Sequence, residues 1–206
     1  MTRLVVATRS EHKLSEIRKM LDDIPGLDVI DLNAAGVEES DEEDAVEAHD
    51  TFAENALAKA RYFARRAGTT VLADDSGLCV DVLNGAPGVR SKRFSGRTDV
   101  RGTALDRANN ALLLATLEDV PAEERTAHYT CAVAVVTPTG AEHVFYGECY
   151  GRILHEPRGV GGFGYDPLFL SDDLGVTFAE ADPQEKNRVS HRARAIAAAH
   201  DALRGL

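Results

Sequence analysis

The sequence lacks any long hydrophobic run. Its longest apolar stretches, such as 111–115 and 131–136, are far shorter than the about 20 residues that a membrane-spanning helix needs. We therefore expect no membrane span. The apolar run 4–7 is too short for a secretory signal, so we expect a cytoplasmic protein. With 44% hydrophobic residues, we expect one domain over residues 1–206.

Cysteine is scarce as well. Cys79, Cys131 and Cys149 form no CxxC pair and lie in apolar or strand-like stretches. This pattern is typical of small buried side chains in a reducing compartment. The seven histidines show neither HExxH spacing nor i, i+4 pairs, so the sequence predicts no zinc site.

Positive charge is the third shortage, with 23 basic against 34 acidic residues, a net charge of −11, and only five lysines. This balance argues against a protein that coats nucleic acid or an anionic membrane. It fits a protein kept soluble in a high-salt cytoplasm, and an ordinary acidic mesophilic enzyme remains the alternative. Eight of the acids lie within residues 38–50, without Lys or Arg. We interpret that block as a solvated loop or helix start.

Hydrophobic periodicity and capping residues predict a mixture of helices and strands. Strands are expected at 4–7, 27–32, 69–73, about 129–135, 143–149 and 152–154, and helices at about 11–24, 51–67, 103–117 and 190–203. Ser10 is the expected N-cap of the first helix, and Gly68 ends the second. The elements do not alternate strictly, and Thr139-Gly140 indicates a hairpin. We therefore expect an α/β or α+β sheet with antiparallel content, covered by helices.

The strongest local signal is Asp74-Asp75-Ser76-Gly77, directly after the predicted strand 69–73. Adjacent carboxylates at the end of a strand suit Mg²⁺, which prefers carboxylate oxygens and keeps waters for its substrate. An Asx turn with Gly at positive φ is the alternative. Glu54, in the first turn of a predicted helix, is a further candidate ligand, although it also completes a Thr51-x-x-Glu54 capping box.

The segment Thr8–Lys13 joins a strand to a helix. Its hydroxyls, its helix-start N–H groups and the Lys13 ammonium could hold phosphate oxygens, but it lacks the glycines of a P-loop. An ordinary capped helix start is the alternative.

The run 159–164 formally matches GxGxxG. We reject a dinucleotide fold because no apolar strand precedes the run and Pro167 interrupts the required helix. Instead, Phe163 and Tyr165 could stack on a planar base, and Asp166 could fix a hydrogen bond. Phe163 as core filler is the alternative.

Residues 186–194 gather four positive charges in an otherwise acidic chain. Ser190 is a good N-cap, which places His191 and Arg192 in a first helical turn, where the helix dipole disfavours cations. This placement suggests an anionic or oxygen-rich ligand, whereas a solvated helix face is the usual meaning of such a run.

Taken together, these stretches resemble the inosine triphosphatase (RdgB-like) family of non-canonical purine nucleoside triphosphate pyrophosphatases. The stretches that carry the resemblance are Ala7-Thr8 with Lys13 and Glu16, Thr51-Phe52 with Glu54-Asn55-Ala56, Ala73–Leu78, Gly85–Gly88, Gly162–Phe169, and Lys186-Asn187 with Ser190-His191-Arg192. They follow in order across most of the chain. One departure is Ser10, where the family usually has Asn, which shortens the reach toward phosphate.

The resemblance implies hydrolysis of ITP, dITP and XTP to the nucleoside monophosphate and pyrophosphate, which removes deaminated purines from the nucleotide pool. It also implies an elongated mixed sheet dividing two α/β lobes around a central cleft, and a homodimer.

Together with the residue chemistry, the resemblance leads us to expect that Glu54, Asp74 and Asp75 hold Mg²⁺ and that Asp75 is the general base. The expected substrate-binding residues are Thr8, Arg9, Ser10, Glu11, His12, Lys13, Lys59, Ser76, Phe163, Gly164, Tyr165, Asp166, Lys186, His191 and Arg192. Two other functions remain as alternatives: a Maf-like pyrophosphatase acting on other nucleotides, and a non-catalytic nucleotide-binding protein.

Overall fold

The computed structural model describes residues 2–205, without the side chain of Asp44. The strands are β1 (Thr2–Val6), β2 (Leu27–Asp31), β3 (Thr70–Val80), β4 (Thr126–Val136), β5 (Glu142–Ile153) and β6 (Phe169–Ser171). The α-helices are α1 (Glu11–Leu21), α2 (Glu43–Val46), α3 (Phe52–Ala67), α4 (Thr103–Thr116), α5 (Pro183–Val189) and α6 (His191–Arg204). No helix among the described residues is long and apolar enough to span a membrane.

The strands form one mixed sheet in the order β2-β1-β3-β4-β5-β6. β1 runs parallel to both β2 and β3, and β5 and β6 are antiparallel. β4 and β5 are neighbours joined by the turn at Thr137–Ala141, as the predicted hairpin requires. The expected mixed α/β fold is therefore confirmed.

The chain divides into two compact units. Unit 1 comprises the residues up to Asp75, Cys131–Gly147 and the residues from His191 onward, and unit 2 comprises Ser76–Thr130 and Glu148–Ser190. The chain passes between the units within β3, β4 and β5 and between α5 and α6.

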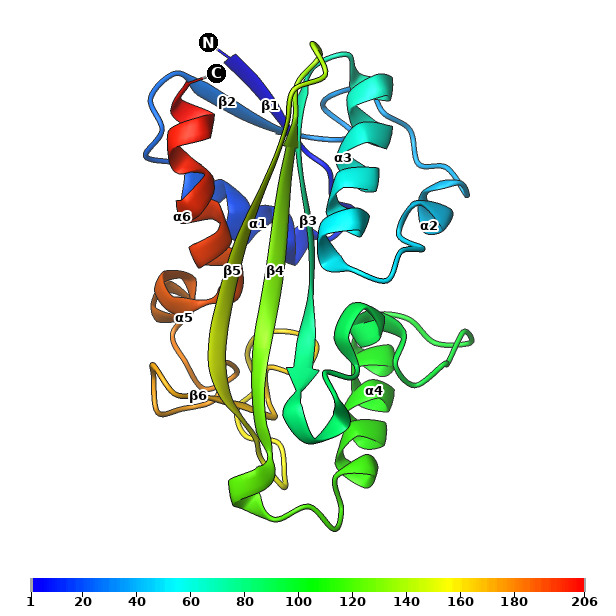
Figure 1. The fold of residues 1–206 in the computed structure, drawn as a ribbon, viewed down its shortest axis with the longest axis vertical. Helices are drawn as coiled ribbons and strands as arrows, with labels where there is room; N and C mark the ends of the chain where they lie inside the picture. The colour runs from blue at the N-terminus through cyan, green and yellow to red at the C-terminus, as the bar shows by residue number, and fades with distance from the viewer. Residues whose placement is uncertain (1, 206) are drawn as a thin grey trace. The chain divides into compact units, whose positions relative to one another are not determined.

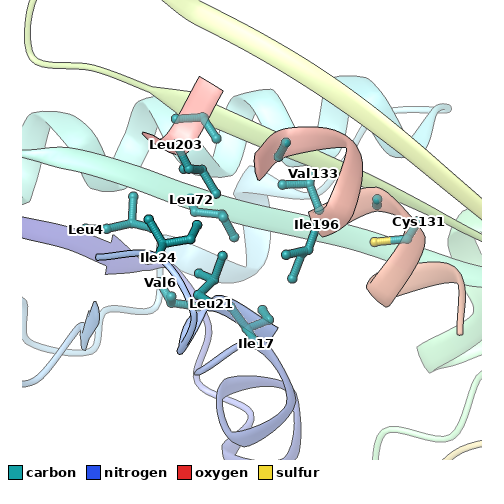
Figure 2. Close-up of a cluster of buried hydrophobic side chains, with 13 residues drawn as sticks. Leu4, Val6, Ile17, Leu21, Ile24, Leu72, Cys131, Val133, Ile196 and Leu203 are labelled. Carbon is teal, nitrogen blue, oxygen red and sulfur yellow. The ribbon is translucent and has the colours of Figure 1, made fainter. Parts of the chain in front are cut away.

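Two apolar cores hold unit 1 together, because successive side chains of a strand point to opposite faces. Leu4, Val6 and Leu72 pack with α1 and α6, whereas Val5, Val71 and Ala73 pack with α3. Figure 1 shows α1 and α6 on one side of these strands and α3 on the other, and Figure 2 shows the first core. In unit 2, Leu113 and Leu117 at the end of α4 belong to a third cluster, with Phe169 and Phe178.

Three predicted helix caps are confirmed, although α1 ends at Leu21 and not near residue 24 as predicted. Ser10 caps α1 by accepting from Lys13 N at 3.4 Å. Thr51 caps α3, and Gly68, at φ +63°, ends it in the left-handed conformation that glycine adopts without strain. The three cysteines are buried and free, as expected.

Two strand predictions were wrong. β3 does not end at Ala73 but continues through Asp74-Asp75-Ser76-Gly77, because β4 flanks it in the sheet and supports extended backbone beyond Leu72, where its pairing with β1 stops. The predicted strand 152–154 is not separate: β5 runs unbroken to Ile153. The short elements α5 and β6 were not predicted, although Asp182-Pro183 is a typical helix start.

Candidate active site

The site in unit 1 lies where the strand order reverses. The chain leaves β1 through α1 to β2 on one side of it, while β3 lies on the other side. In parallel sheets, ligands bind at the carboxyl ends of strands beside such a reversal. Here the segment Thr8–Lys13 follows β1, and Asp74 and Asp75 follow the last residue of β3 that pairs with β1.

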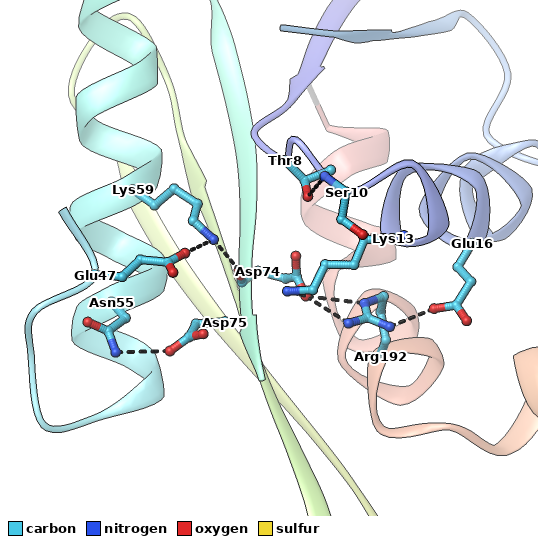
Figure 3. Close-up of polar contacts among 10 residues, drawn as sticks. All are labelled: Thr8, Ser10, Lys13, Glu16, Glu47, Asn55, Lys59, Asp74, Asp75 and Arg192. Carbon is cyan, nitrogen blue, oxygen red and sulfur yellow. Dashed lines mark hydrogen bonds and ion pairs between the residues drawn. The ribbon is translucent and has the colours of Figure 1, made fainter. Parts of the chain in front are cut away.

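Asp74 points toward α1 and α6 (Figure 3). Its Oδ2 lies 3.1 Å from Lys13 Nζ and accepts hydrogen bonds from Arg192 Nε and Nη2 at 3.2 and 3.1 Å. Burial of the Asp74 carboxylate opposes ionisation, but the charges of Lys13, Arg192 and Lys59 outweigh it and hold the pKa far below the ordinary value. Asp74 is therefore a permanent anion that organises two cations.

Asp75 points the other way, toward α3, because it is the next residue of the strand (Figure 3). Its Oδ2 accepts a hydrogen bond from Asn55 Nδ2 at 2.9 Å. Burial raises the pKa of Asp75, and the negative charge of Glu47 raises it further, against the lowering effects of Lys13, Lys59 and Asn55. Two adjacent carboxylates with pKa values pushed apart can divide the work, one staying ionised and the other exchanging a proton.

Glu47 is a site residue that sequence reasoning missed. Its carboxylate pairs with Lys59 Nζ, which also donates to the Asp74 carbonyl oxygen at 2.9 Å. Burial opposes ionisation of Glu47, yet the charge of Lys59 keeps the pKa of this carboxyl below its ordinary value. Asn55 and Lys59 are one turn apart on α3 and share a face, so their partners Asp75 and Glu47 face the same helix surface. Within an eight-acid block, no sequence signal distinguished Glu47.

Glu54 has other contacts. It accepts a hydrogen bond from Thr51 Oγ1 at 2.8 Å and donates its own N–H to that oxygen at 3.2 Å, at the exposed start of α3. Thr51 therefore caps α3 as in the capping box that the sequence left as the alternative, but Glu54 accepts from the Thr51 hydroxyl and not from its backbone N–H. No three His, Cys, Asp or Glu side chains among those described are grouped to hold a metal ion, so Glu54, Asp74 and Asp75 do not converge.

The other predicted site residues of unit 1 differ in how exposed they are: those on the first turn of α1 are exposed, and those at the start of α6 are buried. Thr8 Oγ1 accepts from Ser10 N at 3.1 Å, which shapes the turn before α1. Glu11 and His12 are exposed on the first turn of α1. His191 is buried at the start of α6. Arg192, 1% exposed, donates from Nη1 to Glu16 at 2.6 Å in addition to its bonds with Asp74.

Charge balance in this group fits a divalent cation. Its carboxylates are Glu16, Glu47, Asp74 and Asp75, and its cations are Lys13, Lys59 and Arg192. The ionised group therefore carries one negative charge in excess. Asp74 Oδ1 is buried and accepts no hydrogen bond from the described residues. Hard oxygen donors of this kind suit Mg²⁺ held by one or two carboxylates with waters and phosphates.

Unit 2 brings together Phe163, Asp166 and Lys186. Buried Asp166 accepts from Phe163 N at 2.9 Å and from Lys186 Nζ at 2.8 Å, and Lys186 Nζ lies 4.7 Å from the centre of the Phe163 ring. Gly162, at φ +69°, is required because a Cβ there would collide with the Asp166 carboxylate. The loop therefore presents a half-buried ring beside an ammonium group.

The other unit 2 residues support this loop. Tyr165 is buried and donates its hydroxyl to Ser91 O at 2.9 Å, so it is a core residue and Phe163 is the more accessible ring. Gly164 donates to Asp106 Oδ2 at 3.1 Å and accepts from Asn110 Nδ2 at 3.0 Å. Ser76, on β3, is half-buried.

The chain is similar to known proteins over nearly its whole length. The model of the Ham1 family matches residues 4–202. A dITP/XTP pyrophosphatase of Frankia alni is 53% identical over 94% of this chain and 93% of its own length. One of Geobacter sulfurreducens is 50% identical over 98% and 97%.

Two solved structures are similar to this chain in fold. A HAM1 protein from Coxiella burnetii covers 100% of both chains with a TM-score of 0.85 and 36% identity. A nucleoside-triphosphatase, or dITP/XTP pyrophosphatase, from Mycobacterium abscessus covers 96% of this chain and 98% of its own, with a TM-score of 0.74 and 44% identity. The resemblance seen in the motifs is confirmed: the chain belongs to the Ham1 family.

Proposed function

We propose that this protein hydrolyses ITP, dITP and XTP to the nucleoside monophosphate and pyrophosphate. The observation that carries the proposal is that Asp74 and Asp75 have opposite environments. Asp74 is held ionised by ion pairs with cations, whereas Asp75 is buried and has a raised pKa. The names of the curated relatives supply the substrate class, since they are dITP/XTP pyrophosphatases at 50–53% identity.

In the proposed reaction, Asp75 accepts the proton of the water that attacks the α phosphorus, and the bond to the β phosphate breaks to release pyrophosphate. Asp75 and Glu47 would hold Mg²⁺, which supplies charge neutralisation on the phosphate oxygens. Lys13 and Lys59 orient the triphosphate, with the hydroxyls and N–H groups of the Thr8–Lys13 segment. Arg192 fixes Asp74, which in turn holds Lys13 in position.

For the base, we propose that a 6-oxopurine stacks on Phe163 and accepts a hydrogen bond from Lys186. An ammonium carries three donors and no acceptor, and one of them is used by Asp166. Adenine carries an amino group at position 6, which is itself a hydrogen-bond donor and cannot accept from the Lys186 ammonium. Leaving such a buried group unpaired costs about 1–3 kcal/mol, so ATP should be the poorer substrate.

The test is pyrophosphate release from a panel of ITP, XTP, dITP, GTP, ATP and dUTP with Mg²⁺. We expect the three deaminated purine nucleotides to exceed ATP in kcat/KM by about fivefold to 150-fold, which is the penalty of about 1–3 kcal/mol converted to a ratio. Turnover of dUTP above ITP would favour the Maf-like alternative. No turnover on the whole panel would favour a nucleotide-binding protein and reject the proposal.

The family resemblance also leads us to propose that residues 1–206 act as one functional domain, in a cytoplasmic homodimer. Light scattering after gel filtration tests the dimer: a mass near twice 22.2 kDa is expected, and a mass near 22.2 kDa would contradict it.

A further inference from the structure

The acidic segment 38–50 is attached to the site rather than solvated at a distance from it. Arg9, which follows β1, donates from Nε and Nη2 to the two carboxylate oxygens of Glu43 at 3.0 and 2.7 Å. It also donates to Val37 O and Asn33 Oδ1, both at 3.1 Å. Bidentate Arg–carboxylate pairs fix orientation as well as distance, so Arg9 anchors the segment at Glu43 and, just before its first residue, at Val37.

The end of the segment is anchored on α3. His49 donates its N–H to Asn55 Oδ1 at 2.9 Å, and Asn55 Nδ2 donates to His49 O at 3.3 Å and to Asp75 Oδ2 at 2.9 Å. Asn55 is only 1% exposed. One buried amide therefore joins the backbone of the segment to the proposed general base.

Glu47 lies between these two anchors. A block of like charges repels itself and tends to remain disordered, and α2 spans only four residues. The helix propensity of so short and so charged a segment cannot keep the Glu47 carboxylate near Lys59 and Asp75. The contacts of Arg9 with Glu43 and of Asn55 with His49 must do so.

Arg9 has little capacity left for a phosphate. All three of its guanidinium nitrogens donate to Glu43, Asn33 or Val37. Arg9 also lines a cavity of about 620 Å³ together with Thr8, Ser10 and Asn33, whereas Lys13, Asp74 and Asp75 do not line it. Within one short segment, Arg9 and Lys13 face different surroundings.

We propose that residues 38–50 form a strap that delivers Glu47 to Asp75, and that Arg9 is a positioning residue acting through Glu43 rather than a ligand of the triphosphate. This inference rests on the proposed function, since Glu47 and Asp75 are its metal-holding carboxylates.

The variants Arg9→Lys and Glu43→Gln test the strap, because each removes the bidentate pair while keeping size and polarity. In the protein without nucleotide, we expect faster hydrogen–deuterium exchange over residues 38–50 and unchanged exchange in α6. Calorimetric titration with Mg²⁺ alone should show about tenfold weaker binding, as expected for loss of a charge-assisted bond. The double variant should bind Mg²⁺ no more weakly than the single variant with the lower affinity, because Arg9 and Glu43 act as one unit.

Arg61 and Glu142 give the matched control. They form a bidentate pair at 2.6 and 2.5 Å on the surface of unit 1, so Arg61→Lys and Glu142→Gln should alter neither readout. Unchanged exchange and Mg²⁺ affinity in Glu43→Gln would overturn the strap. A raised KM for ITP in Arg9→Lys alone would make Arg9 a phosphate ligand instead. If the wild-type protein failed to hydrolyse ITP, the proposed function would fail, while the exchange data would still decide whether Arg9 and Glu43 hold the segment.

Discussion

Two adjacent aspartates have opposite electrostatic environments because they are neighbours in a strand. The alternation of side chains turns Asp74 toward two cations and Asp75 toward an amide and a second carboxylate. The pair therefore divides into a structural anion and a titratable group, and this division decides how each responds to substitution.

For Asp74→Asn, we expect a large loss of stability at pH 7. The folded-state pKa of Asp74 lies far below the ordinary value of 3.8, so its ionised form contributes stability above that pH, which is lost as the pH falls through the folded pKa. Removing the charge leaves Arg192 buried without its main partner, which costs about 3–5 kcal/mol in buried pairs. Urea unfolding measures the difference; a variant within about 1 kcal/mol of wild type would contradict this role.

For Asp75→Asn, the expected sign is opposite. A folded pKa above 3.8 means that the stability contributed by Asp75 is present at acid pH and is lost as the pH rises through the folded value. At pH 7 the ionised side chain is therefore a cost that asparagine removes, and the same urea experiment should give equal or higher stability. A loss comparable to that of Asp74→Asn would show that Asp75 is held in place by favourable charges.

At the scale of elements, local signals predicted what depends on local chemistry. Ser10, Thr51 and Gly68 marked helix ends because a cap needs only its own turn. The course of β3 through Asp74–Gly77 could not be predicted, since a turn-like sequence stays extended only when a neighbouring strand supports it.

The candidate site shows the same limit. The motifs predicted Asp74, Asp75, Lys13 and Arg192, and the family resemblance added Lys59. The structure brings these residues together in unit 1. The sequence could not locate Glu47, whose proposed role depends on contacts made by Arg9, far earlier in the chain, and by Asn55 on α3. Nor could it show that Arg192 and Lys186 already contact carboxylates.

Helix α4 provides an element-scale prediction. Asp106 and Asn110, one turn apart, hold both backbone groups of Gly164, next to Phe163. For Asn110→Ala, we expect a KM for ITP raised about threefold to tenfold with unchanged kcat, because one hydrogen bond of about 0.5–1.5 kcal/mol that orients the ring is lost. Exposed Arg107→Ala on the same helix is the control. A lowered kcat with unchanged KM would argue against a role in base binding.

For the whole molecule, the net charge of −11 has a different meaning in the structure than in the sequence. The block 38–50 holds eight of the acids, and without it the chain would carry −3. The sequence suggested a solvating exterior around a cationic cleft. Instead, the block supplies Glu43 and Glu47 to contacts with Arg9 and Lys59. Lys13 and Arg192 are likewise already paired with carboxylates. The negative excess that remains at the site is consistent with the Mg²⁺ of the proposed function.

The turnover number of Asp75→Asn for pyrophosphate release from ITP, at saturating Mg²⁺, tests the central claim most directly. Because Asp75 is the proposed proton acceptor, we predict a decrease of at least about 100-fold, in a variant that unfolds no earlier than the wild type. A turnover number within about threefold of wild type, too small a change for loss of a general base, would contradict the account.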